Sequence, residues 1–486
     1  MNLAKLAAAL GLASLFPGAA RAEFPAEVRL EAGILRGTLS GGGAAWKGIR
    51  YAAPPVGPLR WRAPQPAPRW DGIRDADGYG NDCMQAPVDV DAAPLGAEPD
   101  EDCLYLNLWR PAAAGQGLPV LVWIHGGAFV NGGASPATYS GEALARQGIV
   151  FVGINYRLGR FGTFAHPALT AADEEDGLLG NYGLLDQIAA LEWVRDNVAA
   201  FGGDPGNVTL MGESAGGASV HFLATSPLAQ GLFHKAAILS GMNGGRPGTA
   251  TQEEMEAIGT AFAARHGIEG SGPEALAALR ALPAEEICGG LNWLTMGPEA
   301  GRTWAGPYVD GRIMADPGAA YAAGAFAHVP ALIGATDDDL GGRTGYMVAG
   351  ARQAARTYAA AGLPVWHYRF SYVPGSVEAP GAGHASDIPF FLATEDIRYG
   401  ARTTAADRAA AAMISGALLR FVRRGDPNGP GLPHWPRYDP RTDIVMEFRR
   451  GGGALAGPDP WGAEIDAAPP PCCPDPVGRE RRGARP

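Results

Sequence analysis

Short apolar runs bounded by Gly, Pro or Asn recur along the chain. Their residues are apolar at consecutive positions rather than at alternate ones, which is typical of strands buried on both faces in a parallel sheet. Five such runs predict strands: residues 120–124, 149–154, 208–211, 236–239 and 330–333.

Helical segments separate these predicted strands. The clearest covers residues 183–200, where apolar side chains recur at helical spacing: Leu184, Ile188, Leu191, Val194 and Val198. Alternating strands and helices predict an α/β fold with a mostly parallel, doubly wound sheet flanked by helices.

Two further stretches have a different character. Residues from about 245 to 300 are helical and poor in strand patterns, which predicts an excursion or cap over the sheet. From Gly451 onward Gly and Pro dominate, so residues 451–486 are expected to form a loosely attached tail. The main folded domain is accordingly expected to span residues 23–450.

The first 22 residues have the pattern of an export signal. Lys5 precedes an apolar stretch over residues 6–16, and Ala20-Arg21-Ala22 forms a small-x-small cleavage site. The apolar stretch is too short to anchor the chain in a bilayer. A buried N-terminal helix is the alternative, but Pro17 and Gly18 interrupt it. We therefore expect an exported chain, periplasmic or extracellular, without stable membrane insertion.

Composition excludes several classes of protein. The chain has 486 residues, 47% of them hydrophobic, which permits a large core and argues against a disordered or fibrous protein. Its formal net charge of -11 argues against nucleic acid as a partner, because phosphate binding needs clustered cations. The five cysteines have no zinc-like Cys-His spacing, so no metal site is expected.

A nucleophile elbow is the sharpest local motif. Gly212-Glu213-Ser214-Ala215-Gly216 alone is a weak signal in a chain with 71 glycines. However, it follows the predicted strand 208–211 and precedes a plausible helix at 215–224, the strand-turn-helix context that an elbow requires. This context predicts that Ser214 is an exposed nucleophile at a helix N-terminus.

A second motif follows the predicted strand 120–124. Gly126 and Gly127 lie within His125-Gly126-Gly127-Ala128-Phe129, where small residues allow backbone N–H groups to face a cavity. Together with the amide of Ala215, such groups can form an oxyanion hole.

With these motifs the chain resembles the type-B carboxylesterases, a family that includes cholinesterases, para-nitrobenzyl esterases and some lipases. The resemblance runs from about Ala32 to Phe448 and rests on residues 46–57, 101–107, 126–129, 180–187, 212–216, 233–241 and 425–428. It implies an α/β-hydrolase fold and hydrolysis of carboxylic esters.

The resemblance also implies roles for individual residues. The oxyanion donors would be Gly127, Ala128 and Ala215, and Ser240 would be a buried polar residue near the catalytic group. Cys83 would pair with Cys103, and Arg60 would bridge Glu101.

The base should be a histidine late in the chain, because an α/β-hydrolase places it after the acid. His367 lies in a strand-like segment, where a packed histidine is expected, and His434 lies in a Pro-flanked surface loop. His384 lies in the flexible loop Gly381-Ala382-Gly383-His384, which matches the family's Gly-Ala-x-His motif, with Asp387 at a position where the family often has an acid. We therefore predict His384 as the general base.

The acid belongs to the stretch Asp337-Asp338-Asp339 that follows Ile333-Gly334. Counting from Ile333-Gly334, Asp339 occupies the position of the family's glutamate, and its role would be to orient His384. Asp338 is the alternative. The side chain of Glu213 has two open interpretations: it adds negative potential near His384, or it only anchors the elbow by hydrogen bonds.

The chain departs from the family at three places. Asp339 and His384 are about 45 residues apart, fewer than in most members, which predicts a reduced cap region and a shallower, more open site. Arg50 replaces the family's proline, and Cys288 is the only possible remnant of a second disulfide.

These features predict two-step acyl transfer on a small-molecule ester by a monomer or weak homo-oligomer, with no cofactor and no metal. A catalytically silent binding protein on the same scaffold is the rival, although such members usually lose a catalytic residue. A second alternative retains the chemistry but acts on lipid, feruloyl or polyester bonds.

Overall fold

The computed structural model describes residues 24–88, 93–113, 115–244, 250–297, 303–430 and 433–468. The predicted signal sequence over residues 1–22 lies outside these residues, as do Cys472 and Cys473. Within the described part of the chain, no helix is both long enough and apolar enough to cross a bilayer.

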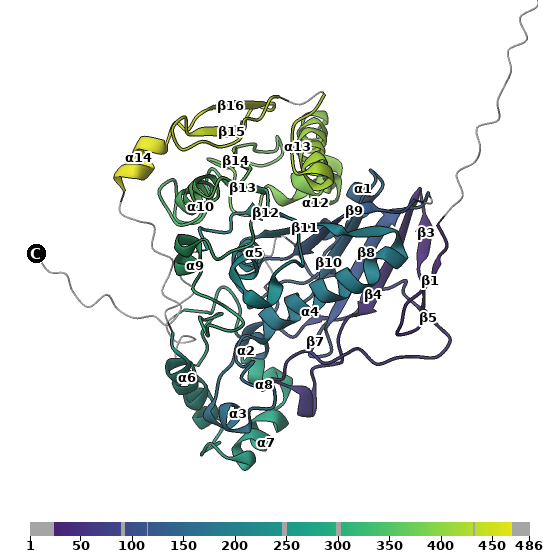
Figure 1. Ribbon diagram of the computed structural model, residues 1–486, viewed down its shortest axis with the longest axis vertical. Coiled ribbons are helices and arrows are strands. Elements are labelled where there is room, and N and C mark those ends of the chain that lie inside the picture. The colour runs from purple at the N-terminus through teal and green to yellow at the C-terminus, as the bar shows by residue number, and fades with distance from the viewer. Residues whose placement is uncertain are drawn as a thin grey trace, which may run out of the picture.

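An eleven-stranded sheet forms the centre of the molecule (Figure 1). Its middle strands are parallel, and antiparallel pairs close both edges. In spatial order the strands are β16 (Ala454–Pro458), β15 (Ile444–Phe448), β14 (Val365–Phe370), β13 (Ala331–Thr336), β12 (Lys235–Leu239), β11 (Gly203–Glu213), β9 (Leu118–Ile124), β10 (Val150–Ile154), β8 (Tyr105–Pro111), β4 (Gly43–Arg50) and β3 (Thr38–Ser40).

Two small sheets lie beside this large one. The first has the order β1 (Glu27–Arg29), β2 (Ile34–Arg36), β5 (Ile73–Asp75), and the second pairs β6 (Asp82–Cys83) with β7 (Pro99–Asp100). Strand β6 contains Cys83, which forms a disulfide with Cys103. Arg60 and Glu101 form the ion pair that the family resemblance implies, with Arg60 Nε donating to Glu101 at 2.7 Å.

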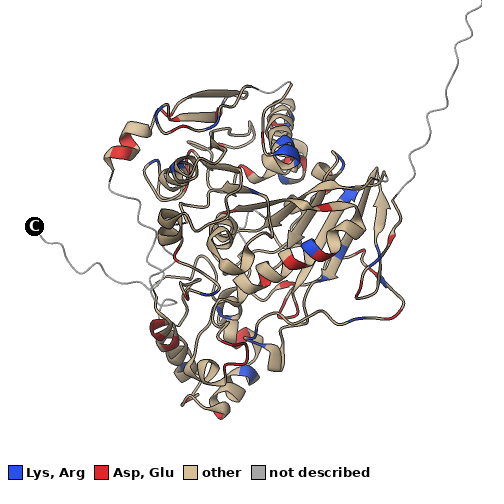
Figure 2. Ribbon diagram, viewed as in Figure 1, with Lys and Arg blue, Asp and Glu red and all other residues tan. Residues whose placement is uncertain are grey.

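Helices cover both faces of the large sheet. One core contains side chains from α4 (Tyr182–Asn197), α5 (Ala215–Thr225) and α10 (Val348–Ala360). The opposite core contains side chains from α1 (Glu142–Ala145), α11 (Ile388–Phe391) and α13 (Ala405–Arg424). Of the charged residues that Figure 2 shows on α4, Glu192, Arg195 and Asp196 are exposed, whereas Asp186 is buried and pairs with Arg157.

Strand β9 illustrates why the strands are apolar at consecutive positions. Val120, Val122 and Ile124 belong to the core that contains α4 and α5, whereas Leu121 and Trp123 belong to the core that contains α13. Successive side chains of a strand point to opposite faces, so a strand covered on both sides needs apolar residues throughout. The predicted doubly wound α/β sheet is confirmed.

The predicted helical excursion is also present. Helices α3 (Pro167–Ala172), α6 (Gln252–Arg265), α7 (Pro273–Ala281) and α8 (Ala284–Cys288) lie together at the lower end of the view in Figure 1. The remaining helices are α2 (Gly159–Gly162), α9 (Pro317–Ala323), α12 (Glu395–Tyr399) and α14 (Gly462–Ala467).

The predicted domain boundary at residue 450 lies within the sheet and not at its end. Beyond it, β16 pairs with β15 over five residues and α14 follows. Arg369 donates from both terminal nitrogens to Asp459 at 2.7 and 3.0 Å, and its guanidinium lies 3.8 Å from the centre of the Trp461 ring. Because the Asp459 side chain is fully buried, this charge pair ties the segment to the sheet despite its Gly and Pro content.

This ion pair yields a stability prediction. Asp459→Asn leaves the buried Arg369 without its counter-charge, which typically costs about 3–5 kcal/mol of unfolding free energy. Urea unfolding of the full chain measures the change. Asp396→Asn is the matched control, because Asp396 pairs with Arg408 at the surface with more than half of its side chain exposed, and should leave the transition unchanged. An equally stable Asp459→Asn variant would contradict the proposed tie.

Candidate functional site

Ser214 lies at a sharp turn between β11 and α5. Its φ of 56° and ψ of -121° are unusual for a residue with a side chain, as expected of a strained elbow. The neighbouring glycines make the turn possible. A Cβ on Gly212 would lie 2.3 Å from the carbonyl oxygen of Gly216, and a Cβ on Gly216 would lie 2.1 Å from that of Ile124.

His384 joins Ser214 to an aspartate. Its Nε2 lies 2.9 Å from Ser214 Oγ, and its Nδ1 lies 2.6 Å from Asp339 Oδ1. The His384 loop is fixed to the acidic loop, since the amide of Asp338 donates to the carbonyl of Ala382 at 3.0 Å. The structure therefore brings together the three side chains that the sequence singles out.

The three consecutive aspartates occupy different environments. Asp339 is buried and accepts from Ser240 Oγ at 2.7 Å as well as from the amide of Leu340 at 2.7 Å. Burial alone would raise the pKa of Asp339, but the bonds from His384 and Ser240 outweigh it and lower the pKa. Asp337 instead accepts from the amide of Ala382 at 2.6 Å, and Asp338 is exposed. Among the described residues, Asp339 is the aspartate of this trio that contacts His384.

Glu213 adds a second carboxylate beside His384. It is buried, and its Oε1 lies 3.3 Å from His384 Nε2. Burial works to lower the pKa of His384, but the negative charges of Glu213 and Asp339 outweigh it and raise the pKa to about 9. This proximity favours the electrostatic interpretation of Glu213 over a purely anchoring one.

The glycine-rich loop after β9 lies against the elbow. A Cβ on Gly126 would lie 3.0 Å from Ser214 Cβ. Gly127, Ala128 and Phe129 all have positive φ, at 100°, 55° and 62°. The expected oxyanion donors Gly127, Ala128 and Ala215 thus belong to two segments that pack against each other beside Ser214.

The two other late histidines are placed as expected. His367 is buried, with Nδ1 3.0 Å from the carbonyl oxygen of Ile333, and burial lowers its pKa to about 4. His434 is exposed on a loop.

Sequence analysis missed two buried hydroxyl groups near the site. Tyr368 donates to Asp387 at 2.9 Å, and Tyr156 donates to the carbonyl of His125 at 2.9 Å. Burial raises the pKa of Asp387 to about 7. Asp387 was noticeable as an acid three residues after His384. Tyr368 in β14 and Tyr156 just after β10 carry no sequence signal that separates them from ordinary core residues.

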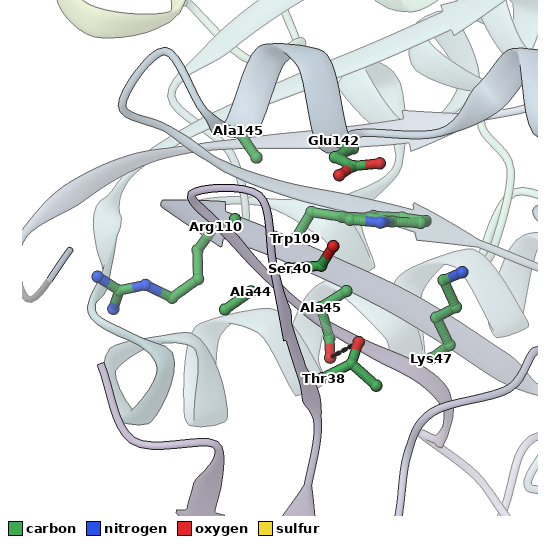
Figure 3. A pocket seen from close by; sticks show the side chains of 10 residues that line it. Thr38, Ser40, Ala44, Ala45, Lys47, Trp109, Arg110, Glu142 and Ala145 are labelled. Atoms are coloured by element: carbon green, nitrogen blue, oxygen red, sulfur yellow. Dashed lines mark hydrogen bonds between the residues drawn. The ribbon is translucent and has the colours of Figure 1, made fainter. Parts of the chain in front are cut away.

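A separate cavity of about 210 Å³ lies between α1 and strands β3, β4 and β8 (Figure 3). Its three charged side chains contact other residues. Lys47 Nζ lies 4.4 Å from the centre of the Tyr79 ring, Arg110 donates to the carbonyl of Phe201 at 2.7 Å, and Glu142 pairs with Arg146. In the sheet, β9 and β10 separate this cavity from the strand that carries Ser214. Among the described residues, no group of His, Cys, Asp and Glu could hold a metal ion.

Comparisons with known proteins agree with this geometry. The model of the carboxylesterase family matches residues 25–348 and 343–455. The chain is 33% identical to fumonisin B1 esterase of Sphingopyxis macrogoltabida, over 89% of this chain and 88% of that protein. It is 35% identical to para-nitrobenzyl esterase of Bacillus subtilis (strain 168), over 85% of this chain and 93% of that protein.

Solved structures show the same similarity. A para-nitrobenzyl esterase structure superposes with a TM-score of 0.79 at 31% identity, covering 90% of this chain and 99% of that one. A carboxylesterase of Geobacillus stearothermophilus superposes with a TM-score of 0.77 at 34% identity, covering 91% and 99%. With its α/β-hydrolase fold and a family match over most of its length, the chain belongs to the carboxylesterase family and is a carboxylic-ester hydrolase.

Proposed function

We propose that this carboxylesterase works through an acyl-enzyme formed on Ser214, with His384 as general base and acid and Asp339 as the acid that orients it. The proposal is supported above all by the two contacts of the His384 ring. Nε2 lies 2.9 Å from Ser214 Oγ, and Nδ1 lies 2.6 Å from Asp339 Oδ1. A hydroxyl is a poor nucleophile at neutral pH, so it needs a base at this distance.

In the first step His384 Nε2 removes the proton of Ser214 as Oγ attacks the ester carbonyl. The carbonyl oxygen becomes an oxyanion, held by the amides of Gly127, Ala128 and Ala215. The imidazolium then protonates the leaving alcohol as the carbon–oxygen bond breaks. Asp339 accepts the Nδ1–H bond throughout and stabilises the positive ring.

In the second step a water molecule takes the place of the alcohol. His384 accepts a proton from this water as its oxygen attacks the acyl carbon. The second oxyanion collapses, Ser214 Oγ leaves with the proton returned by His384, and the carboxylic acid is released. No cofactor takes part, and the partner is a small-molecule ester.

The alternative of a catalytically silent binding protein is disfavoured by the site itself. Ser214, His384 and Asp339 all have competent side chains in hydrogen-bond contact. Lipid, feruloyl and polyester bonds involve the same chemistry, so rates on a panel of such esters distinguish them. We also propose that the chain is exported, periplasmic or extracellular, as the pattern of residues 1–22 and the Cys83–Cys103 disulfide suggest.

Replacing the nucleophile tests the proposal directly. Ser214→Ala should lower kcat for p-nitrophenyl acetate on the order of 10⁶-fold, because no acyl-enzyme can form. The wild type should react covalently with a fluorophosphonate probe at Ser214, and peptide mass spectrometry identifies the labelled residue. Retention of substantial activity or of labelling in Ser214→Ala would refute the assignment.

The three aspartates provide a second test with internal controls. Asp339→Asn should lower kcat by about 10⁴-fold, since the neutral amide cannot stabilise the imidazolium and its NH₂ group can donate to Nδ1, which favours the wrong tautomer of His384. Asp338→Asn changes an exposed side chain and should keep wild-type activity, and Asp337→Asn retains an oxygen acceptor for Ala382. Full activity of Asp339→Asn would show that another acid serves His384.

The pKa of His384 predicts the pH profile. Only the neutral ring accepts a proton, so kcat/KM should fall as the pH drops through the pKa of about 9. Glu213→Gln removes one of the charges that raise this pKa, so the acidic limb of the profile should move to lower pH. Asp338→Asn removes an equal charge at an exposed position and should leave the limb in place. An unmoved limb in Glu213→Gln would contradict the electrostatic role.

A further inference from the structure

A short turn over residues 290–296 exposes three large apolar side chains. Trp293, Leu294 and Met296 are 40%, 60% and 36% exposed. The other exposed large hydrophobic residues of the described chain are isolated from one another in the sequence. Single exposed hydrophobic residues are ordinary, but a cluster marks a surface that binds something apolar.

The turn is held in a fixed conformation. Asn292 Oδ1 accepts from the amides of Leu294 and Thr295 at 2.9 and 3.1 Å, and the Asn292 amide donates to Thr295 Oγ1 at 2.9 Å. The amide of Met296 donates to the carbonyl of Asn292 at 2.9 Å. The three apolar side chains are therefore presented by a backbone that is already ordered, which lowers the entropic cost of binding.

Hydrogen bonds connect this turn to the loop that supplies the oxyanion donors. The amide of Trp293 donates to Asn131 Oδ1 at 2.9 Å, and the amide of Asn131 donates to the carbonyl of Gly127 at 2.9 Å. Asn131 is buried, and its Nδ2 donates to the carbonyl of Ala86 at 2.8 Å. One residue thus fixes the turn relative to Gly127, through its side chain on one side and its backbone amide on the other.

Apolar contacts make the same connection. Leu291, within the turn, forms a buried cluster with Val130 and Trp304, and Ala128 packs against that cluster. Buried apolar contacts therefore link the turn to Ala128, the residue next to Gly127.

A buried arginine fixes the base of this excursion. Arg160 donates to the carbonyls of Ile287 and Cys288, both at 2.9 Å, and to Thr303 at its carbonyl and hydroxyl, at 3.0 and 2.8 Å. These contacts join the segment before the turn to the segment after it. Movement of the turn away from the site would break hydrogen bonds of a buried charged group, which is energetically costly.

The exposed side chains of the turn indicate the kind of group this surface accepts. Trp293, Leu294 and Met296 carry no charge and present mainly hydrocarbon to the solvent. Such a surface favours an apolar alkyl or aryl chain over a charged one.

We propose that Trp293, Leu294 and Met296 bind the longer apolar chain of the ester, so that this carboxylesterase prefers neutral esters with an extended alkyl or aryl group. The inference rests on the proposed function, because it assumes that the ester reacts at Ser214. Each methylene fully buried against such a surface can raise kcat/KM by up to about fourfold.

The test compares chain-length series in the full-length protein. The double variant Trp293→Ser/Leu294→Ser should lose about tenfold in kcat/KM on long substrates and keep the wild-type rate on p-nitrophenyl acetate. One series is p-nitrophenyl esters from acetate to decanoate, and the other is alkyl acetates from ethyl to octyl. Loss in the first series assigns the acyl chain to the turn, and loss in the second assigns the alcohol chain.

Leu455→Ser is the matched control, because Leu455 is 57% exposed on edge strand β16. It should keep both chain-length profiles. Unchanged profiles in the double variant would overturn the inference, as would an equal loss on acetate and decanoate. A wild-type dimer that becomes monomeric in the double variant by sedimentation, with the profiles intact, would identify the turn as an interface instead. If the wild type neither hydrolyses p-nitrophenyl acetate nor is labelled at Ser214, the proposed function fails, not the turn alone.

Discussion

The rest of the site depends on one imidazole that contacts a hydroxyl and a carboxylate at the same edge of a parallel sheet. Ser214 follows β11 and Asp339 follows β13, while His384 lies on the loop after β14. Because β11, β12, β13 and β14 are successive parallel neighbours, their carboxyl ends meet at one edge. The contacts of His384 with Ser214 Oγ and Asp339 Oδ1, at 2.9 and 2.6 Å, tolerate little displacement. The packing on both faces of the sheet therefore serves to fix the carboxyl ends of these strands relative to one another.

The negative charges of the acids around His384 have two opposing effects on catalysis. Glu213 and Asp339 stabilise the positively charged ring, which is the state of His384 while an oxyanion exists. The same charges raise the pKa of His384 to about 9, which reduces the fraction of neutral ring available at lower pH. Ser240 and the amide of Leu340 keep Asp339 ionised through direct hydrogen bonds, so both effects of its charge persist. The site thus gains stabilisation of the charged intermediate at the expense of activity in acid.

Sequence patterns predicted the features that depend on local composition. Strands covered on both faces are apolar throughout, so the middle of the sheet was recognisable, and the elbow was recognisable because its glycines are sterically required. β16 was not recognisable, since Ala454–Pro458 contains Gly and Pro and depends on a distant Arg369–Asp459 pair. The choice among three adjacent aspartates rested on counting alone, because burial and the bond to Ser240 arise only from tertiary structure. Asn131 was missed for the same reason: its importance comes from contacts with Gly127 and Trp293.

The short interval between acid and base explains why the excursion after α8 matters. Between Asp339 and His384 the chain forms α10, which packs on the sheet, and β14, which belongs to it, with only turns around them. These residues are committed to the core and leave little chain to wall the site on the side of His384. Apolar contacts with a substrate must therefore come largely from the side of the oxyanion loop, where Leu291, Val130 and Trp304 pack beside Ala128. With so few residues between Asp339 and His384, specificity depends on the turn that Asn131 and Arg160 hold on the other side of the site.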